Sequence, residues 1–259
     1  MEHIAPTHEH LRLTSSTQSI HLVHHLLSQE ECNELIATQT DLTAYETRYA
    51  RRNRSIFPDP KLSERIWSRI QPFFKDEICM DDDGEEWKVQ GLNEVWRLVR
   101  YDEGGIFGPH TDGTRLADLN TQSFMTINIY LNTVPPSQGG STRFLQSVVP
   151  SSAVLPASQI LTSIQPNRGT ALIFAHDVPH DGDIVQNGGT KYLLRTDMMY
   201  RRCQEFDFER LVERKGLESG REKGEQALKI ANALEDAGTR DLAIVWYKKA
   251  FRLCPELDV

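Results

Sequence analysis

The first third of the chain alternates between apolar positions at helical spacing and short polar runs. From His21 to Thr40 the apolar residues recur every three to four positions, and Ser28 and Glu31 have the spacing of a capping box just inside this segment. Residues 62–74 repeat the helical spacing, with large apolar side chains on one side. The pattern therefore predicts helices over residues 21–40 and 62–74.

Three polar runs in the same region predict irregular segments. Residues 1–15 have the composition of a loose polar leader, and the basic run 51–54 leads into Pro58 and Pro60. The acidic run 81–86 follows the second helix, and its spacing does not match a calcium-binding loop. We expect a loop at the last two runs, with the acidic one solvated.

After Glu94 the pattern changes to short apolar stretches that are typical of strands. Glycine, proline and asparagine turns separate these stretches. The expected strands are residues 95–101, 124–132, 142–145, 170–175 and 191–200. Such a series predicts an all-β barrel or jelly roll, and the earlier helices would buttress one face of it.

The composition changes again after Arg202. Residues 205–259 contain no proline before Pro255 and are rich in Glu, Lys, Ala and Leu, which predicts two or three helices broken at Gly238. The expected organisation is one domain over residues 1–203, with its β core at about 93–201, and a helical segment over 216–259.

The helical segment resembles one tetratricopeptide repeat. Its small residues and a tyrosine fall at the intervals of that repeat: Ala227, Ala231, Ala243, Tyr247, Ala250 and Pro255. Small residues allow two antiparallel helices to approach closely, so we expect a helical hairpin. A single unit is fewer than the roughly three that independent stability requires. The hairpin would therefore pack on the core, recruit a protein partner or promote self-association.

Composition and charge narrow the functional class. The net charge of −8, from 29 basic and 37 acidic residues, argues against a nucleic-acid groove. No stretch approaches the roughly 20 apolar residues that a membrane helix needs, and we expect no signal peptide. Four widely spaced cysteines suit reduced thiols. We expect a cytoplasmic protein, with the nucleus as the second candidate location, that binds neither nucleic acid nor a membrane.

Candidate chemistry begins with His110 and Asp112, which follow the glycine-rich run 104–109. In extended backbone, residues i and i+2 point to the same side, so this imidazole and this carboxylate converge. A distant histidine would complete a two-histidine, one-carboxylate facial triad of the kind that binds iron(II) and leaves positions open. The His-x-Asp pair is weakly specific when taken alone.

His180, which Asp181 and Gly182 follow, is the candidate third ligand. His176 is the alternative, but Pro179 lies between the two histidines and argues against a shared helical face. Lys191 opens the next predicted strand and could present a fixed cation to a dicarboxylate within the barrel.

Between Asn93 and Tyr200 the chain resembles the iron(II)/2-oxoglutarate-dependent dioxygenases, in the branch related to prolyl 4-hydroxylases. The landmarks are RLVRYDEGGIFGPHTDG, the IYLN strand, GGSTRFL, and the ending H-D-G…G-x-K-Y-x-L-R-x-D-x-x-Y. The resemblance implies a double-stranded β-helix core (a jelly roll, cupin-like) that is mainly β with flanking helices. It also implies hydroxylation of an unactivated C–H bond with release of succinate and CO2. The implied cofactors are Fe(II), 2-oxoglutarate as cosubstrate and O2, with ascorbate as a candidate reductant.

The resemblance extends to individual positions. It implies that His110, Asp112 and His180 bind iron, and that Lys191 pairs with the distal carboxylate of 2-oxoglutarate. Tyr130 matches a position that donates a hydrogen bond to that carboxylate, and Tyr101 matches an aromatic residue near the metal. Both tyrosines would serve equally as ordinary core residues. The interval from His180 to Lys191 is one residue longer than in collagen-type prolyl hydroxylases, so Arg195 competes for the anchoring role.

The substrate stays open at this level, because a fold does not select it. We expect a peptidyl substrate of the prolyl type, or an amino acid or another small molecule. Arg51, Arg52 and Arg54 form either a surface run or a basic loop that orients an acidic substrate. One alternative is a non-catalytic adaptor that binds a protein partner through residues 216–259. A zinc hydrolase is less consistent with the sequence, because Lys191 and Tyr130 would have no role in it.

Overall fold

The computed structural model describes residues 4–13, 18–38, 41–81, 83–148 and 155–258, and it is mainly β. The strands are β1 (Thr7–Arg12), β2 (Ser19–His24), β3 (Thr43–Glu46), β4 (Ala50–Pro58), β5 (Ile78–Met80), β6 (Glu86–Leu92), β7 (Val95–Tyr101), β8 (Ile106–His110), β9 (Leu116–Asp118), β10 (Thr121–Tyr130), β11 (Thr142–Leu145), β12 (Ile160–Ile164), β13 (Ala171–Ala175), β14 (His180–Gly182) and β15 (Lys191–Arg202). The α-helices are α1 (Gln29–Thr38), α2 (Pro60–Phe74), α3 (Phe208–Arg214), α4 (Gly220–Asp236) and α5 (Arg240–Leu253). Among the described residues, no helix combines the length and the apolar composition needed to cross a membrane.

The described residues divide into two compact units. The first contains those of segments 1–75, 91–113 and 124–198, and the second contains those of segments 76–90, 114–123 and 199–259. The predicted boundary between residues 203 and 216 stays a prediction.

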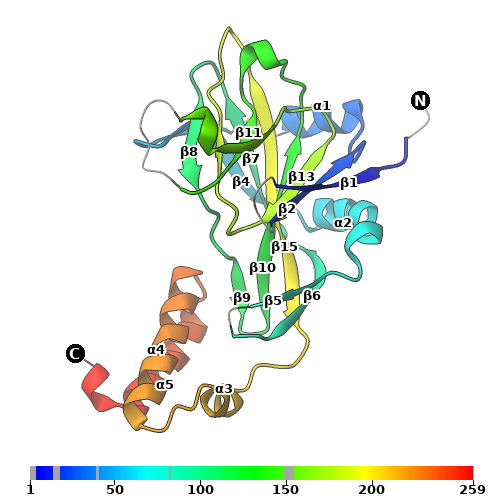
Figure 1. The fold of residues 1–259 in the computed structure, drawn as a ribbon. Helices are drawn as coiled ribbons and strands as arrows, with labels where there is room; N and C mark the ends of the chain where they lie inside the picture. The colour runs from blue at the N-terminus through cyan, green and yellow to red at the C-terminus, as the bar shows by residue number, and fades with distance from the viewer. Residues whose placement is uncertain (1–3, 14–17, 39–40, 82, 149–154, 259) are drawn as a thin grey trace. The chain divides into compact units, whose positions relative to one another are not determined.

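The first unit is built on a curled antiparallel sheet (Figure 1). Its strands follow the order β1-β2-β13-β10-β15-β7-β4-β8-β14-β11-β12, and β3 pairs with β4. The four strands β13, β10, β15 and β7 form one layer, and β8, β14, β11 and β12 form a second one, with β4 hydrogen-bonded to both β7 and β8. This arrangement fits the jelly-roll core expected from the sequence. The strands predicted at residues 95–101 and 142–145 are confirmed at those bounds.

A close backbone approach sets one of the turns in this sheet. Gly139 has φ of 64°, and a Cβ atom there would lie 2.2 Å from the carbonyl oxygen of Ile184. Glycine is therefore required where the segment before β11 meets the segment after β14. The turn before β11 therefore depends on this glycine.

The N-terminal segment differs from the prediction. Residues 7–12 form β1 instead of a loose leader, and residues 19–24 form β2 instead of the first part of a helix. Helix α1 begins at Gln29, and its capping box is confirmed: the Glu31 amide donates to Ser28 Oγ at 3.2 Å, and the Ser28 amide donates to Glu31 at 2.9 Å. A short apolar run fits either structure, and the pairing of β2 with β13 selects the strand here.

Helix α2 confirms the second predicted helix and packs on the sheet. Asp59 caps its first turn by accepting a hydrogen bond from the Leu62 amide at 2.9 Å. Ser63 accepts a hydrogen bond of 2.9 Å from the indole of Trp96 in β7, and the ring of Phe74 lies 5.2 Å from that of His21 in β2. These contacts place α2 against strands β7 and β2.

The two predicted loops are also corrected. The basic run 51–54 lies within β4, which pairs with β7, so its side chains alternate between the two faces of the sheet. In the acidic run, Glu85 is buried and ion-paired with Arg202 at 3.2 Å and with Arg214, so it is not part of a solvated loop. Asp82 lies outside the described residues.

The second unit contains the C-terminal helices. Gly238, with φ of 84°, lies between α4 and α5, where the sequence predicts a break. A small apolar core joins α3, α4 and α5 through Phe208, Val212, Ala227 and Ala250. The resemblance of this segment to a tetratricopeptide repeat stays a prediction.

Candidate active site

The structure brings His110, Asp112 and His180 together within the first unit. His110 ends β8, His180 begins β14, and the two residues are register partners in an antiparallel pair. The Nε2 atoms of His110 and His180 lie 3.7 and 3.6 Å from the two carboxylate oxygens of Asp112. One ligand atom from each residue falls within 4.8 Å of the others. Within the described part of the chain, no other such group of histidine, cysteine or acidic side chains is found.

Both imidazoles are held in the form that binds a metal. The Nδ1 atom of His110 lies 2.8 Å from the Gly108 carbonyl oxygen, and that of His180 lies 2.9 Å from the Val178 carbonyl oxygen. Each Nδ1–H therefore donates to the backbone and leaves an Nε2 lone pair that faces Asp112. Burial and the neighbouring His180 lower the pKa of His110 to about 4, so the ring is neutral near pH 7.

Asp112 is ionised in spite of its burial. Only 5% of its side chain is exposed, which disfavours the charged form. Arg195 Nη2 lies 2.8 Å from Oδ1, and the Thr126 hydroxyl donates to Oδ2 at 2.6 Å. Together with His180, these partners outweigh the burial and hold the pKa of the carboxyl below its usual range. Two neutral imidazoles and one carboxylate are the donor set of a facial Fe(II) site.

Lys191 begins β15 on the same cavity and is 3% exposed. Its Nζ atom lies 3.5 Å from Thr142 Oγ1 and 5.6 and 5.4 Å from the ring centres of Tyr101 and Tyr130. Among the described residues, no carboxylate lies within ion-pair distance of this ammonium group. Burial lowers the pKa of Lys191 to about 8.

Tyr101 lines the cavity, whereas Tyr130 lies behind its lining in the buried core. Tyr130 is buried in the core and donates a hydrogen bond of 2.8 Å to Thr142 Oγ1, the same atom that lies near Lys191. Tyr101 lines the cavity, and its hydroxyl accepts a hydrogen bond of 3.1 Å from Arg52. The structure thus places both tyrosines around the ammonium group of Lys191.

Arg195, the alternative anchor for 2-oxoglutarate, and His176, the alternative metal ligand, both have other partners. Arg195 faces the cavity but is paired with Asp112, and its Nη2 atom also lies 3.6 Å from Asp197 Oδ1. His176 Nε2 lies 3.7 Å from Asp197 Oδ1, and His176 is not part of the three-residue group. The backbone carbonyl of His176 accepts a hydrogen bond from the Asp112 amide at 2.9 Å.

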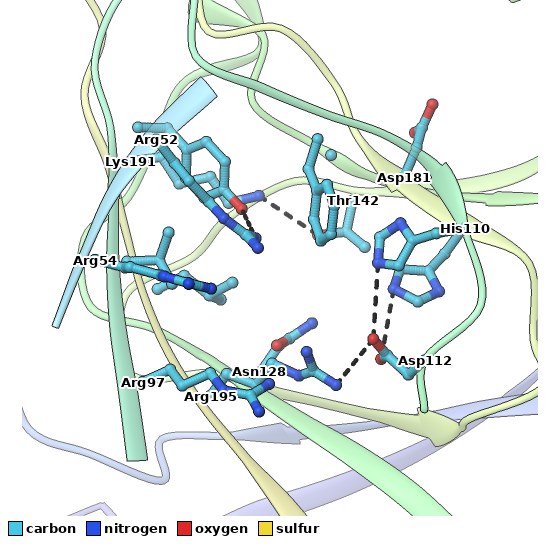
Figure 2. A pocket seen from close by; sticks show the side chains of 16 residues that line it. Arg52, Arg54, Arg97, His110, Asp112, Asn128, Thr142, Asp181, Lys191 and Arg195 are labelled. Atoms are coloured by element: carbon cyan, nitrogen blue, oxygen red, sulfur yellow. Dashed lines mark hydrogen bonds and ion pairs between the residues drawn. The ribbon is translucent and has the colours of Figure 1, made fainter. Parts of the chain in front are cut away.

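Several lining residues were missed by the sequence reasoning. The cavity is lined by Arg52, Arg54, Arg97, Val99, Tyr101, Phe107, His110, Asp112, Asn128, Thr142, His180, Asp181, Gly182, Lys191, Leu193 and Arg195 (Figure 2). The period of two along each strand is the signal that could have found Arg97 and Asn128, because each shares a face with a predicted site tyrosine. Thr142 carried no comparable signal, because only the pairing of its strand brings it to Lys191.

The family comparison covers this part of the fold. Residues 96–196 match the family described as the 2OG-Fe(II) oxygenase superfamily. The matched segment runs from β7 to β15 and contains the histidine–aspartate group and Lys191. This part of the chain is therefore similar to a 2OG-Fe(II) oxygenase domain. The metal and the cosubstrate of the domain are Fe(II) and 2-oxoglutarate, and the donor set described above fits this metal.

Similar solved structures include a Pseudomonas putida prolyl-4-hydroxylase, with a TM-score of 0.48 and 17% identity over 73% of this chain and 95% of that one. The viral collagen prolyl hydroxylase of Paramecium Bursaria Chlorella virus-1 has a TM-score of 0.48 and 20% identity over 70% and 96%. HygX from Streptomyces hygroscopicus, solved with nickel and 2-oxoglutarate bound, has a TM-score of 0.48 and 12% identity over 72% and 84%. The comparison with curated proteins found no match.

Proposed function

We propose that the protein is an Fe(II)- and 2-oxoglutarate-dependent dioxygenase. It hydroxylates an unactivated C–H bond, converting 2-oxoglutarate and O2 into succinate and CO2 with one oxygen atom entering the product. The observation that carries this proposal is that a histidine–aspartate triad with metal-binding geometry faces the same cavity as a buried lysine, which has no carboxylate within ion-pair distance in the described residues.

The residues of the chain have distinct roles in this reaction. His110 and His180 bind the iron through Nε2, and Asp112 binds it through its carboxylate. When bound, Fe(II) supplies the activation of O2 that couples decarboxylation of the cosubstrate to hydroxylation. The backbone carbonyls of Gly108 and Val178 hold the two imidazoles in orientation.

Lys191 anchors the distal carboxylate of 2-oxoglutarate. Its ammonium lacks an anionic partner in the described residues, and the Thr142 hydroxyl beside it supplies a second polar contact. Arg195 is less suited to this role, because it already pairs with Asp112. The apolar side chains of Val99, Phe107 and Leu193 line the cavity and limit the access of water.

The substrate we propose is peptidyl, of the prolyl type, or an amino acid. This choice rests on the sequence motifs shared with the prolyl 4-hydroxylase branch. Residues 216–259, interpreted as a tetratricopeptide-like unit, would bind a protein partner of the enzyme.

The proposal is tested by anaerobic absorption spectroscopy of the purified full chain. We expect addition of Fe(II) and then 2-oxoglutarate to produce a visible metal-to-ligand charge-transfer band. His180→Ala and Asp112→Ala should abolish the band together with 2-oxoglutarate turnover, because each removes a ligand. His176→Gln is the matched control, since it changes a nearby histidine outside the triad, and the band should persist in it.

The opposite outcome would support a different function. Absence of the band together with failure to retain iron would contradict the proposal and favour a non-catalytic adaptor that acts through residues 216–259. Full turnover in His110→Ala or Asp112→Ala would show that the metal is held elsewhere.

A further inference from the structure

The cavity that contains the triad holds an excess of positive charge. Its cationic lining residues are Arg52, Arg54, Arg97, Lys191 and Arg195, whereas its acidic ones are Asp112 and Asp181. The negative charge of Asp181 is balanced by Arg143, which lies outside the cavity lining and donates two hydrogen bonds to the carboxylate, at 2.8 and 2.6 Å. A chain with a net charge of −8 thus concentrates cations at this one place. Fe(II) and 2-oxoglutarate carry opposite charges of equal size, so together they leave the excess uncompensated.

Three of these cations form a group on neighbouring strands. Arg54 is in β4, Arg97 in β7 and Arg195 in β15, and Arg97 and Arg195 are direct register partners. Lys191 lies four residues before Arg195 on β15, about 13 Å away along an extended strand. Figure 2 shows Arg97 and Arg195 on the side of the cavity opposite Lys191 and Thr142, with Arg54 between the two ends.

Two of the three arginines keep their charge available. Arg195 is already paired, with Asp112 at 2.8 Å and Asp197 at 3.6 Å. The guanidinium of Arg54 lies 3.9 Å from the ring centre of Tyr45 and has no carboxylate partner among the described residues. The side chain of Arg97 has no hydrogen bond or ion pair with any other residue that the structure describes, and its nearest acidic influences are Asp197 and Asp112. Burial and the neighbouring Arg195 lower the pKa of Arg97. The charged form of Arg97 is therefore unfavourable in the folded protein when no ligand is bound. Like charges directly opposite each other in a sheet are destabilising, and a bound anion would remove that cost.

A polar group beside the arginines also lacks a partner. Asn128 is 6% exposed and lines the same cavity. Its Oδ1 atom is buried without a hydrogen-bond donor in the described residues. Buried amide oxygens normally accept a hydrogen bond, so Asn128 is suited to an N–H or O–H group of a ligand.

We propose that Arg54 and Arg97, beside the paired Arg195, form a second anion site, and that the substrate carries a carboxylate or phosphate group bound there. Resting on the proposed function, this assignment places the anion at the far end of the cavity from the cosubstrate anchor. The planar guanidinium groups donate paired hydrogen bonds to oxyanions, which fixes the orientation of the substrate as well as its affinity. The C–H bond to be hydroxylated then faces the triad.

The test uses the full chain with Fe(II) and saturating 2-oxoglutarate under anaerobic conditions. Sodium phosphate and sodium acetate are titrated separately by calorimetry, with sodium chloride at matched ionic strength as the control, while the charge-transfer band is monitored. We expect one of the two oxyanions to bind while the band persists. The oxyanion that binds identifies the group as phosphate or carboxylate.

Variants tie the binding to the arginines. Arg97→Gln should weaken binding of that oxyanion about tenfold or more, because it removes charge-assisted hydrogen bonds. It should leave the affinity for 2-oxoglutarate within about twofold, because Lys191 is untouched. Arg100→Gln is the matched control, since Arg100 lies on the same strand but outside the cavity lining and pairs with Asp102. If Arg97→Gln does not fold, Arg54→Gln replaces it.

Three results would contradict the proposed anion site. Lack of binding, binding that displaces 2-oxoglutarate, or equal binding in Arg97→Gln and the unmodified chain would overturn the second site. Failure of the proposed function can be distinguished from failure of the second anion site, because the charge-transfer band is then missing before any oxyanion is added.

Discussion

The ammonium group of Lys191 lies between two tyrosine rings, with the Thr142 hydroxyl 3.5 Å away. A buried cation without an anionic partner is costly, and residues of this kind are common at functional sites. Arg195 differs, because Asp112 already compensates its charge at 2.8 Å. At the scale of single residues, the contrast between these two side chains favours Lys191 as the proposed cosubstrate anchor and Arg195 as a residue that positions the carboxylate of the proposed metal site.

Lys191→Met should raise the dissociation constant of 2-oxoglutarate about 100-fold, since it leaves a buried carboxylate without its cation. The affinity for Fe(II) should change little, because the side chain does not touch the triad. Titration of the charge-transfer band with 2-oxoglutarate measures the effect. Arg195→Lys is the comparison variant, and a larger loss of 2-oxoglutarate affinity in it than in Lys191→Met would make Arg195 the anchor.

The pH dependence of cosubstrate affinity follows from the same residue. Burial lowers the pKa of Lys191 to about 8 in the free protein, and a bound carboxylate raises it again. The affinity should therefore be constant below that pKa and should weaken about tenfold per pH unit above it. Titrations between about pH 7 and pH 9.5 test this. Lys191→Arg should remove the dependence, because a guanidinium stays charged; an unchanged slope in that variant would contradict the assignment.

At the scale of elements, the strands β4, β7 and β15 determine which side chains meet in the cavity. Their two-residue period places Arg97, Val99 and Tyr101 on the cavity face of β7. The like-charged pair Arg97 and Arg195 is directly opposed in the register. A pair of this kind lowers the stability of a sheet, so its presence at the site indicates a role in binding.

Arg97→Met should raise the free energy of unfolding by about 0.5 kcal/mol, within the range of cross-strand pair effects. The reason is that the folded protein holds the charged form of Arg97 unfavourably, as the lowered pKa indicates. Urea denaturation measured without ligands tests the effect. Arg100→Met is the control, because Arg100 pairs with Asp102 and should not gain stability. Loss of stability in Arg97→Met would mean that its packing outweighs its charge.

The sequence predicted some elements and not others for identifiable reasons. The strand at residues 95–101 and the helix at 62–74 have strong local patterns, and both formed within two residues of the expected bounds. Residues 19–24 and 50–58 became strands because β2 pairs with β13 and β4 pairs with β7, which no local pattern reveals. The same reason explains why Thr142 was missed, because it reaches the cavity only through the pairing of its strand. The motif spacing pointed to His110, Asp112, His180 and Lys191, and the period of two along the strands was the unused signal for Arg97 and Asn128.

At the scale of the whole molecule, every residue that lines the cavity belongs to the first unit. The second unit has its own apolar core, in which the ring of Phe208 from α3 lies 5.3 Å from that of Trp246 from α5. Glu85 joins two segments of this unit through ion pairs with Arg202 and Arg214. The cofactor chemistry and the C-terminal helices can therefore be separated by truncation.

Two truncated chains should behave differently. A chain of residues 1–215 keeps α3 but loses α4 and α5, so Phe208 and Val212 lose the helices that cover them. Exposed apolar clusters promote association, and we expect this chain to aggregate in size-exclusion chromatography.

A chain of residues 1–203 also lacks α3, keeps the ion pair of Glu85 with Arg202, and should stay soluble. It should bind 2-oxoglutarate within about twofold of the full chain, because distant changes are nearly independent. If residues 1–215 instead remain monomeric and soluble, the C-terminal helices are not needed to cover α3. The exposed residues Leu242, Ile244 and Val245 of α5 are available to a partner in either case.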